Sequence, residues 1–414
     1  MLKKISRPLI VALALFQTGV GVQALQAQEQ NNTLQKKVIF ELRPRWEYVD
    51  VENNNRETAN AATVRARLGF EVKYKFLKFY VENTLVSAFT DKYAPLDGGY
   101  EVVPDEPQFR FTQLWVGYNN NLLDFKFGRQ VINLDNQRFI GAVNWRQTPQ
   151  TFDAARLDIR PIKGLTFTTA YICSRQGVLD SLSTDICSDE PINHSAVLHL
   201  SYTAFKPVKI SAYAYHFNDV ADTYGANFKG NYSVMGISFN YWAEYAHQIV
   251  HNDARNIYDT ADYYHLKLGS AVSTAYGKPF FNVGYEYLGQ HFVTPLATLH
   301  AFNGWADVFL KYTAGSNAYG LKDLYLTLGY QHSRFGKFQG VLHKFTAPED
   351  FPGGGDEFGT EIDLLWAKKI TKNLSVVAKY AKYDASSEAK NAGVGANDVT
   401  KAWLMLTYSF SRSF

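Results

Sequence analysis

The C-terminal segment of the chain, residues 401–414, alternates between two kinds of side chain. Large apolar or aromatic residues stand at every second position from Leu404 to Phe410, and smaller or more polar residues such as Thr407 and Ser409 stand between them. Successive side chains of a β-strand point to opposite faces. The pattern therefore predicts a strand with one apolar and one more polar face at the very end of the chain, closed by the aromatic Phe414.

The N-terminal segment has the composition of an export signal. Lys3, Lys4 and Arg7 precede an uncharged, mostly apolar stretch over 8–22, and Ala24 and Ala27 offer small-residue cleavage sites. This predicts a signal peptide over residues 1–27 that is removed on export, with 28–414 forming one domain. No later stretch approaches the 18 or so consecutive apolar residues of a transmembrane helix.

An exported chain without a helical anchor can still span a membrane if its strands close into a barrel, because closure satisfies every backbone group inside the hydrocarbon. The C-terminal strand fits the closing strand of a barrel in the outer membrane of a Gram-negative bacterium, and Phe414 resembles the signal that the barrel-assembly machinery reads. The composition agrees: 46% of residues are apolar and 15% are aromatic. Abundant Tyr and Trp suit the girdles at the two membrane interfaces.

Charge and cysteine content narrow the function classes. The formal net charge is +3, and the predicted signal peptide carries three positive residues, so the mature chain is close to neutral. Nothing in this balance supports nucleic-acid binding, and any preference for anions must come from where charges lie. Cys173 and Cys187 flank a polar stretch; in an exported chain they form either a loop disulfide or two free thiols, and their spacing does not suggest a metal site.

The sequence pattern of the mature chain predicts an all-β, antiparallel transmembrane barrel of about eighteen strands. Alternating segments of roughly ten residues are separated by nine long loops and eight short turns, with both termini on the short-turn side. The pattern is weakest after residue 217. There we expect a loop over 218–230, then strands Tyr232–Phe239 and Trp242–Ile249 around a turn near Asn240. A barrel of this size encloses a water-filled lumen.

Arginines on apolar strands must face such a lumen, because Arg or Lys facing mid-bilayer lipid costs about 2–4 kcal/mol. Arg129 is in phase with Phe127 and would face outward unless Gly128 bulges the strand or the barrel ends there. Arg138 and Arg146 lie in a long loop that could fold inward as a constriction. The predicted pore-lining and substrate-binding residues are Arg43, Arg45, Arg65, Arg67, Arg129, Arg138, Arg146, Arg156 and Arg160.

These arginines have two interpretations. In the first, they form a positive track that favours carboxylate or phosphate groups. In the second, they pair with acids on the same strands, such as Glu41, Glu47, Glu71 and Asp158, and brace the wall. Both interpretations stay open on the sequence.

Two loop blocks and two strand blocks are more specific than alternation. They are Gly128–Gln130 with 135–154, Thr294–Asp307, Gly320–Tyr325 and Lys379–Asp384. These blocks resemble the alginate export family, and the resemblance extends from about Arg43 to Phe414. It implies an eighteen-stranded monomeric outer-membrane barrel that passively conducts an anionic polysaccharide or small solute past an arginine-lined constriction.

Other function classes are less well supported. The ten histidines are scattered and form no motif of a hydrolase, and His300 with Asp307 is better interpreted as packing and hydrogen bonding than as catalysis. A barrel enzyme and a surface adhesin are the alternatives to a channel. We expect no cofactor, no metal and no covalent chemistry, while the solute and the direction of transport stay open.

Overall fold

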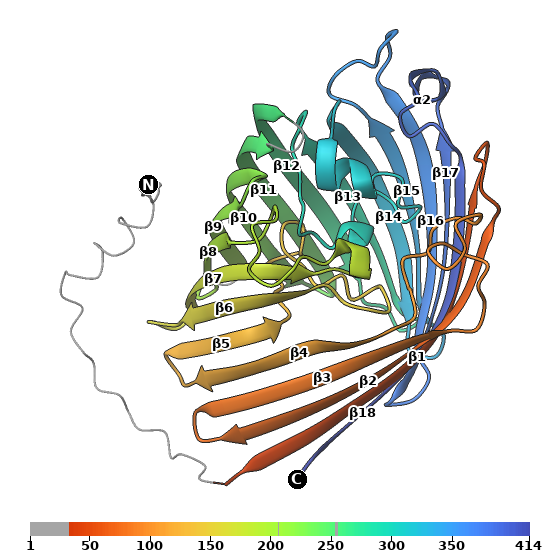
Figure 1. Cartoon of the computed structure of the whole chain (residues 1–414). Coiled ribbons are helices and arrows are strands. Elements are labelled where there is room, and N and C mark those ends of the chain that lie inside the picture. Colours follow the sequence, from red (N-terminus) through yellow and green to blue (C-terminus); the bar gives the residue numbers. More distant parts are fainter. Residues whose placement is uncertain (1–32, 206, 253–255) are drawn as a thin grey trace.

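The structure is a computed structural model that describes residues 33–205, 207–252 and 256–414. It is an eighteen-stranded antiparallel sheet in which each strand pairs with its neighbours in sequence and β1 pairs with β18, so that the sheet closes into a barrel (Figure 1). The predicted fold class is confirmed. The predicted signal peptide lies outside the described residues.

The strands follow one another around the barrel. They are β1 Gln35–Val51, β2 Ala59–Tyr74, β3 Leu77–Ala88, β4 Gln108–Asn119, β5 Leu123–Gln130, β6 Thr151–Ile159, β7 Leu165–Gln176, β8 Ser195–Tyr202, β9 Val208–Phe217, β10 Ala221–Val234, β11 Ile237–Asn252, β12 Ile257–Val272, β13 Lys278–Leu288, β14 Leu321–His332, β15 Gly336–Thr346, β16 Glu357–Lys369, β17 Leu374–Ala385 and β18 Val399–Ser413.

Helical elements are few and short. They are the 3-10 turns η1 Asp180–Leu182 and η3 Leu299–Ala301, the π-helical turn η4 Tyr312–Ser316, and the α-helix α2 Ser387–Ala392. No helix in the described part of the chain is long and apolar enough to cross a membrane. Cys173 and Cys187 form a disulfide bond that joins β7 to the loop after it, which settles the choice that the sequence left open.

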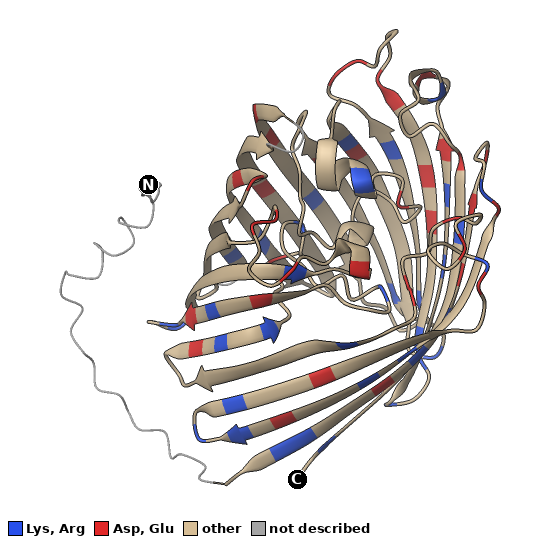
Figure 2. Cartoon of the chain, viewed as in Figure 1, with Lys and Arg blue, Asp and Glu red and all other residues tan. Residues whose placement is uncertain are grey.

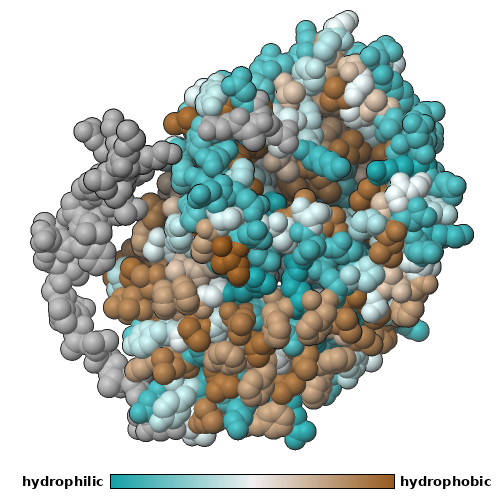
Figure 3. Space-filling view, in the orientation of Figure 1, coloured by the Kyte–Doolittle hydropathy of each residue, from teal (hydrophilic) through white to brown (hydrophobic). Residues whose placement is uncertain are grey.

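The two faces of the wall differ as the alternation predicts. On β2, the outward Leu68 is 54% exposed, whereas the inward Arg65 is only 2% exposed. The same holds on β18, where Leu404 is exposed and Trp403 is buried. Apolar side chains gather over the outer wall around β2 to β5, and hydrophilic ones cover the end with the long loops (Figure 3). This division gives the barrel an apolar exterior and a polar interior.

The prediction for residues 218–250 was wrong in detail. The connection between β9 and β10 spans only 218–220. The turn between β10 and β11 consists of Met235 and Gly236, and both of these residues have a positive φ. Two central residues with positive φ are what a two-residue type I′ hairpin requires. Asn240 instead lies within β11 opposite Asn231. Gly225 and Gly230 weaken the strand signal of β10, because glycine has low β-propensity.

Candidate functional site

Two long loops fold into the barrel and fill part of its lumen. They are the inner loop 131–150, between β5 and β6, and the inner loop 289–320, between β13 and β14 (Figure 1). Ile140 and Leu296, one from each loop, are fully buried. The loops are joined by backbone hydrogen bonds, from Gly141 N to Leu296 O at 2.9 Å and from Thr298 N to Gln137 O at 2.9 Å. They therefore act as one internal barrier.

The inner loop 131–150 is fixed to the barrel wall at three places, of which the first is Asp135. Its carboxylate lies 2.7 Å from His199 Nε2 and accepts hydrogen bonds from Lys209 Nζ at 3.1 Å, Ser211 Oγ at 3.0 Å and Asn227 Nδ2 at 2.9 Å. Burial would raise the pKa of Asp135, but these polar partners outweigh burial and hold the pKa well below its usual range. The loop therefore presents a carboxylate to β8, β9 and β10.

The second attachment is Arg138, which is fully buried. Its Nε lies 3.0 Å from Glu286 Oε1 on β13, and its Nη2 donates to Asn303 Oδ1 in the other inner loop at 2.9 Å. The guanidinium also stacks over Phe302, 4.7 Å from the ring centre. Arg138 thus connects the two inner loops and the wall.

The third attachment is Arg146, at the far side of the lumen. Its Nη1 donates to both oxygens of Glu47 on β1 at 3.0 Å, and its Nη2 donates to Asp307 Oδ2 at 3.3 Å. Asp105, from the loop between β3 and β4, lies 3.9 Å away. Burial would lower the pKa of Arg146, but Glu47, Asp105 and Asp307 outweigh it and raise the pKa above its ordinary value.

Arg43, Arg45 and Arg65 hold the same loop by its backbone. Arg43 donates to the carbonyl oxygens of Asn144 and Trp145 and, through Nε, to Gln147 Oε1 at 3.0 Å. Arg45 donates to Trp145 O at 2.6 Å, and Arg65 donates to the carbonyl oxygens of residues 146 and 147. All three arginines are 5% exposed or less. These three side chains point inward, and they are buried against the inner loop 131–150.

The remaining predicted arginines lie in partly exposed ion pairs. Arg67 Nε lies 3.5 Å from Glu82, Arg156 chelates Asp158 through two hydrogen bonds of 3.1 and 3.0 Å, and Arg160 lies 3.5 Å from Asp124 near the short-turn end. Arg129 chelates Asp153 at 2.8 and 2.9 Å and stands one residue from the long-loop end of β5, at the rim. These ion pairs support the second interpretation of the sequence, in which the arginines pair with acids and brace the wall.

A buried series of hydrogen-bonded side chains, Lys379–His300–Asp307–Lys401, forms a relay at the inner loop 289–320. Burial lowers the pKa of His300 to about 3, so its ring is neutral. The Nδ1–H of His300 donates to Asp307 Oδ1 at 2.7 Å, and its Nε2 accepts from Lys379 Nζ at 2.8 Å. Lys401 donates to Asp307 Oδ2 at 3.0 Å. Burial would raise the pKa of Asp307, but His300 and Lys401 outweigh burial and hold it well below its usual range.

Three tryptophans surround the Lys379 ammonium. Its Nζ lies 3.6 Å from the ring centre of Trp305, 4.4 Å from that of Trp145 and 5.5 Å from that of Trp403. Each inner loop contributes one of these rings and β18 contributes the third. Such cation–π contacts are strongest where water is excluded, so Lys379 ties both inner loops to the closing edge of the barrel.

Carboxylates on β13 and β16 hold the same loop from the other side. Ala306 N donates to Glu361 Oε1 at 2.7 Å, Trp305 N donates to Asp363 Oδ2 at 3.2 Å, and Asn303 Nδ2 donates to Glu286 Oε2 at 2.7 Å. Gly304 has a φ of 82°, and a Cβ there would overlap the Glu361 carboxylate. Only glycine lets the backbone approach this wall so closely.

A cavity of about 370 Å³ lies beside this contact. It is lined mainly by polar and aromatic side chains, among them His265, Glu286, Phe302, Asn303, Tyr325 and His343. His265 Nδ1 is buried there without a hydrogen-bond partner among the described residues. The cavity has the mixed lining of a place where a small hydrophilic solute can rest.

Sequence reasoning identified the inward arginines and the inward folding of the loop with Arg138 and Arg146, but neither the inward folding of the loop 289–320 nor the groups that face the two loops. Glu286, Glu361, Asp363, Lys379 and Lys401 all belong to the buried set of their strands. The alternation rule that selected the arginines would have selected these residues too. The tryptophans around Lys379 left no such signal, because their meeting depends on how the loops fold.

Histidine, aspartate and lysine are close enough at His300 to ask whether they form a catalytic group. Nε2 of His300, the atom that would serve a nucleophile as base, faces the Lys379 ammonium instead. Both nitrogens of the ring are therefore engaged in fixing the loop, in agreement with the packing interpretation of the sequence.

Solved structures share the fold of this chain, and one of them is an outer membrane protein. OccAB4 of Acinetobacter baumannii is 12% identical, with 93% of this chain and 99% of that chain covered and a TM-score of 0.72. OccK9 (OpdG) of Pseudomonas aeruginosa is 15% identical, with 91% and 98% covered and a TM-score of 0.69. The outer membrane protein opdK of the same species is 12% identical, with 91% and 99% covered and a TM-score of 0.70.

Sequence comparison gives the family. No curated protein matches this chain at a significant level. Residues 49–289, more than half of the chain, match the alginate export family, which confirms the family resemblance. The first loop block lies within this match, and the blocks from Thr294 onward lie beyond it. With its closed eighteen-stranded barrel and its inward-folded loops, the chain belongs to the alginate export family.

Proposed function

We propose that this protein is a passive channel of the outer membrane that prefers small anionic solutes or segments of an anionic polysaccharide. The solute crosses by diffusion along its concentration gradient, past the inner loops, and no bond is made or broken. The barrel fold, the apolar exterior and the family support a channel in this membrane, and the solved opdK structure is that of an outer membrane protein.

The observation that carries the anion preference is the state of the guanidinium groups on β1 and β2. Arg43 has no carboxylate within ion-pair distance among the described residues, since it donates to backbone carbonyl oxygens and to the amide oxygen of Gln147. Arg67 Nε lies 3.5 Å from Glu82, and its Nη2 is buried without a hydrogen-bond partner in the same part of the chain. Guanidinium N–H groups that keep no carboxylate partner can bind the carboxylate or phosphate oxygens of a solute.

The chain ends fit this location. We infer that residues 1–27 direct export and are removed, and that the long loops face outward while both termini face the periplasm. The side chain of Phe414 is exposed, and we infer that the barrel-assembly machinery reads it. We further infer that the barrel functions as a monomer.

Ion selectivity in planar bilayers tests the proposal. In a KCl gradient, the purified wild-type protein should show a reversal potential of the sign that reports chloride preference, and Arg67→Gln should reduce it. Arg334→Gln is the matched control, because Arg334 carries the same charge in the exposed short turn between β14 and β15. A cation preference in the wild type, or an equal change in both variants, would contradict the assignment to the arginines.

A further inference from the structure

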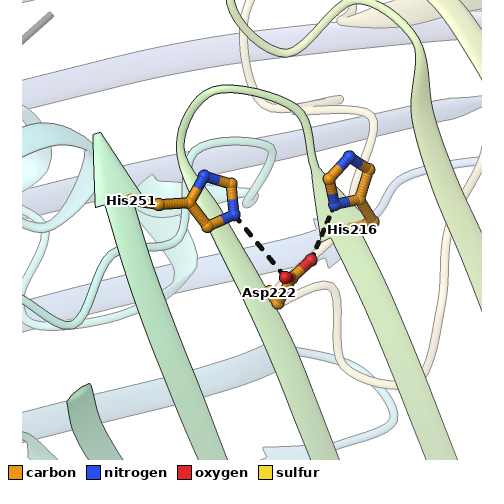
Figure 4. A group of neighbouring side chains, drawn as sticks. All are labelled: His216, Asp222 and His251. Carbon is orange, nitrogen blue, oxygen red and sulfur yellow. Dashed lines mark hydrogen bonds and ion pairs between the residues drawn. The ribbon is translucent and has the colours of Figure 1, made fainter. Parts of the chain in front are cut away.

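A second cluster of ionisable side chains lies outside the lumen, at the long-loop end of three adjacent strands. His216 stands near the end of β9, Asp222 near the start of β10 and His251 near the end of β11 (Figure 4). Asp222 lies directly opposite His216 in the β9–β10 pairing. The three-residue connection 218–220 brings these strand ends together, so the fold itself assembles the cluster.

Alternation places the cluster on the outer face of the wall. Its neighbours on the inner face, Phe217, Thr223 and Val250, are 3% exposed or less. Tyr224 and Ile249, which follow on the same outward face, are 48% and 43% exposed. The cluster therefore sits at the rim, immediately beyond the outward band of aromatic and apolar residues, and it belongs to neither inner loop.

The side chains converge on one point. His216 Nδ1 lies 2.6 Å from Asp222 Oδ1, and His251 Nε2 lies 3.7 Å from Asp222 Oδ2. The ligand atoms of the three residues all lie within 4.8 Å of one another, and the two imidazole rings stack at 6.0 Å. Two neutral imidazole nitrogens and one carboxylate oxygen are a usual set of protein ligands for zinc.

We propose that His216, Asp222 and His251 bind one Zn²⁺ ion on the outer rim of the barrel. Ligand bonds of about 2.0–2.2 Å require the three atoms to close around the ion. Nδ1 of His216 must then give up its hydrogen bond to Asp222 and offer a lone pair, with its ring proton on Nε2. The ligands stand near the ends of three adjacent strands, so only side-chain rotation is needed. The fourth position stays open to water.

The described part of the chain also contains other histidine–aspartate pairs that lack the third ligand. His247 Nδ1 lies 2.9 Å from Asp262 Oδ1, and His291 Nδ1 lies 3.0 Å from Asp259 Oδ2. Neither pair belongs to a group of three metal-ligand side chains among the described residues. Since these pairs resemble the proposed site in chemistry and exposure, they are matched controls for unspecific binding by surface histidines.

Calorimetric titration of the folded protein in detergent, without a histidine tag, tests the site. Wild type should bind one Zn²⁺, and His216→Ala, His251→Ala and Asp222→Asn should each weaken binding at least about tenfold. His247→Ala should leave the affinity unchanged. Mg²⁺ and Ca²⁺ should bind poorly, because both ions prefer oxygen ligands.

Cobalt substitution gives an independent readout that does not depend on affinity alone. Co²⁺ bound at the wild-type site should produce the visible absorption of a low-coordinate complex with nitrogen ligands, and His251→Ala should abolish it. Absence of stoichiometric Zn²⁺ binding by the wild type would overturn the proposal. So would a loss in His247→Ala as large as that in His251→Ala. Neither result bears on ion conduction, so the channel function stands or falls separately.

Discussion

Two parts of the barrel wall, β1–β2 (the donating wall) and β16 (the accepting wall), which are separated only by β17 and β18, hold the inner loops by opposite means. On β1 and β2, Arg43, Arg45 and Arg65 donate hydrogen bonds to backbone carbonyls of the inner loop 131–150. On β16, Glu361 and Asp363 accept hydrogen bonds from backbone N–H groups of the inner loop 289–320. Figure 2 shows both basic and acidic residues on β1 to β6 and on the later strands, so the difference lies in which groups reach the backbone of the loops. The donating wall donates hydrogen bonds to loop carbonyls, and the accepting wall accepts them from loop N–H groups.

The sequence already contains this division. Between Arg175 and Arg412, arginine occurs only at positions 255 and 334. The residue ranges of β8 to β17 contain no arginine. A guanidinium offers five N–H groups in a fixed fork, so it can satisfy several carbonyls of an irregular loop at once. A carboxylate offers only acceptors, which suits exposed N–H groups. Each part of the wall therefore offers the groups that the backbone of its loop needs: guanidinium N–H groups face loop carbonyls, and carboxylates face loop N–H groups.

The strongest way to break the donating wall is Arg146→Gln. The change leaves Glu47, Asp105 and Asp307 buried without their shared cation, and removing one partner of a buried pair costs about 3–5 kcal/mol. We expect a large fall in the thermal unfolding temperature and noisier channel currents. Arg334→Gln, in the turn between β14 and β15, serves as the control and should change neither quantity.

Breaking the accepting wall should have a smaller effect. Glu361→Ala removes the acceptor of Ala306 N, and a buried N–H group left without a partner costs about 1–3 kcal/mol. Glu361→Gln keeps an acceptor oxygen and should cost less. Chemical unfolding of the three proteins measures the order. Equal losses for Ala and Gln would show that the Glu361 charge, and not its acceptor, holds the loop.

Acidification should loosen the relay that links the two walls. The pKa of His300 is about 3 in the folded protein, against 6.5 ordinarily, so the unfolded chain binds a proton that the folded protein excludes. Stability therefore falls as the pH drops below 6.5, by about 1 kcal/mol down to pH 5.5. Comparison of thermal unfolding at the two pH values checks this. His300→Gln should reduce the difference; an unchanged pH dependence would contradict the assignment.

The smallest effect is expected at a partly exposed pair that touches neither inner loop. Arg156 and Asp158 have side chains that are 19% and 11% exposed, and both stand on β6. Partly exposed ion pairs are worth up to about 1 kcal/mol, so Arg156→Gln should change unfolding by less than Arg146→Gln. A loss as large as that of Arg146→Gln would show that the wall is braced by its own pairs and not by the loops.

The local sequence pattern was sufficient to predict the strands of the barrel but not the contacts inside it. The alternation of Leu404 and Leu406 with Met405 predicts β18 because strand faces depend on neighbours two residues apart. The glycines of β10 blurred that signal and displaced a turn. Asp135 meets His199 across 64 positions of sequence, and Arg138 meets Glu286 across still more. Such contacts depend on the folded path of the loops, which no local period encodes.

Single-channel conductance tests the central claim that the two inner loops, held by the donating wall and the accepting wall, form the constriction. The informative variant replaces residues 134–149 with a short Gly-Ser linker, which can close the gap because Gln130 of β5 pairs with Phe152 of β6. The account predicts a conductance clearly larger than that of wild type, with weaker ion selectivity. A folded variant with wild-type conductance and selectivity would contradict it.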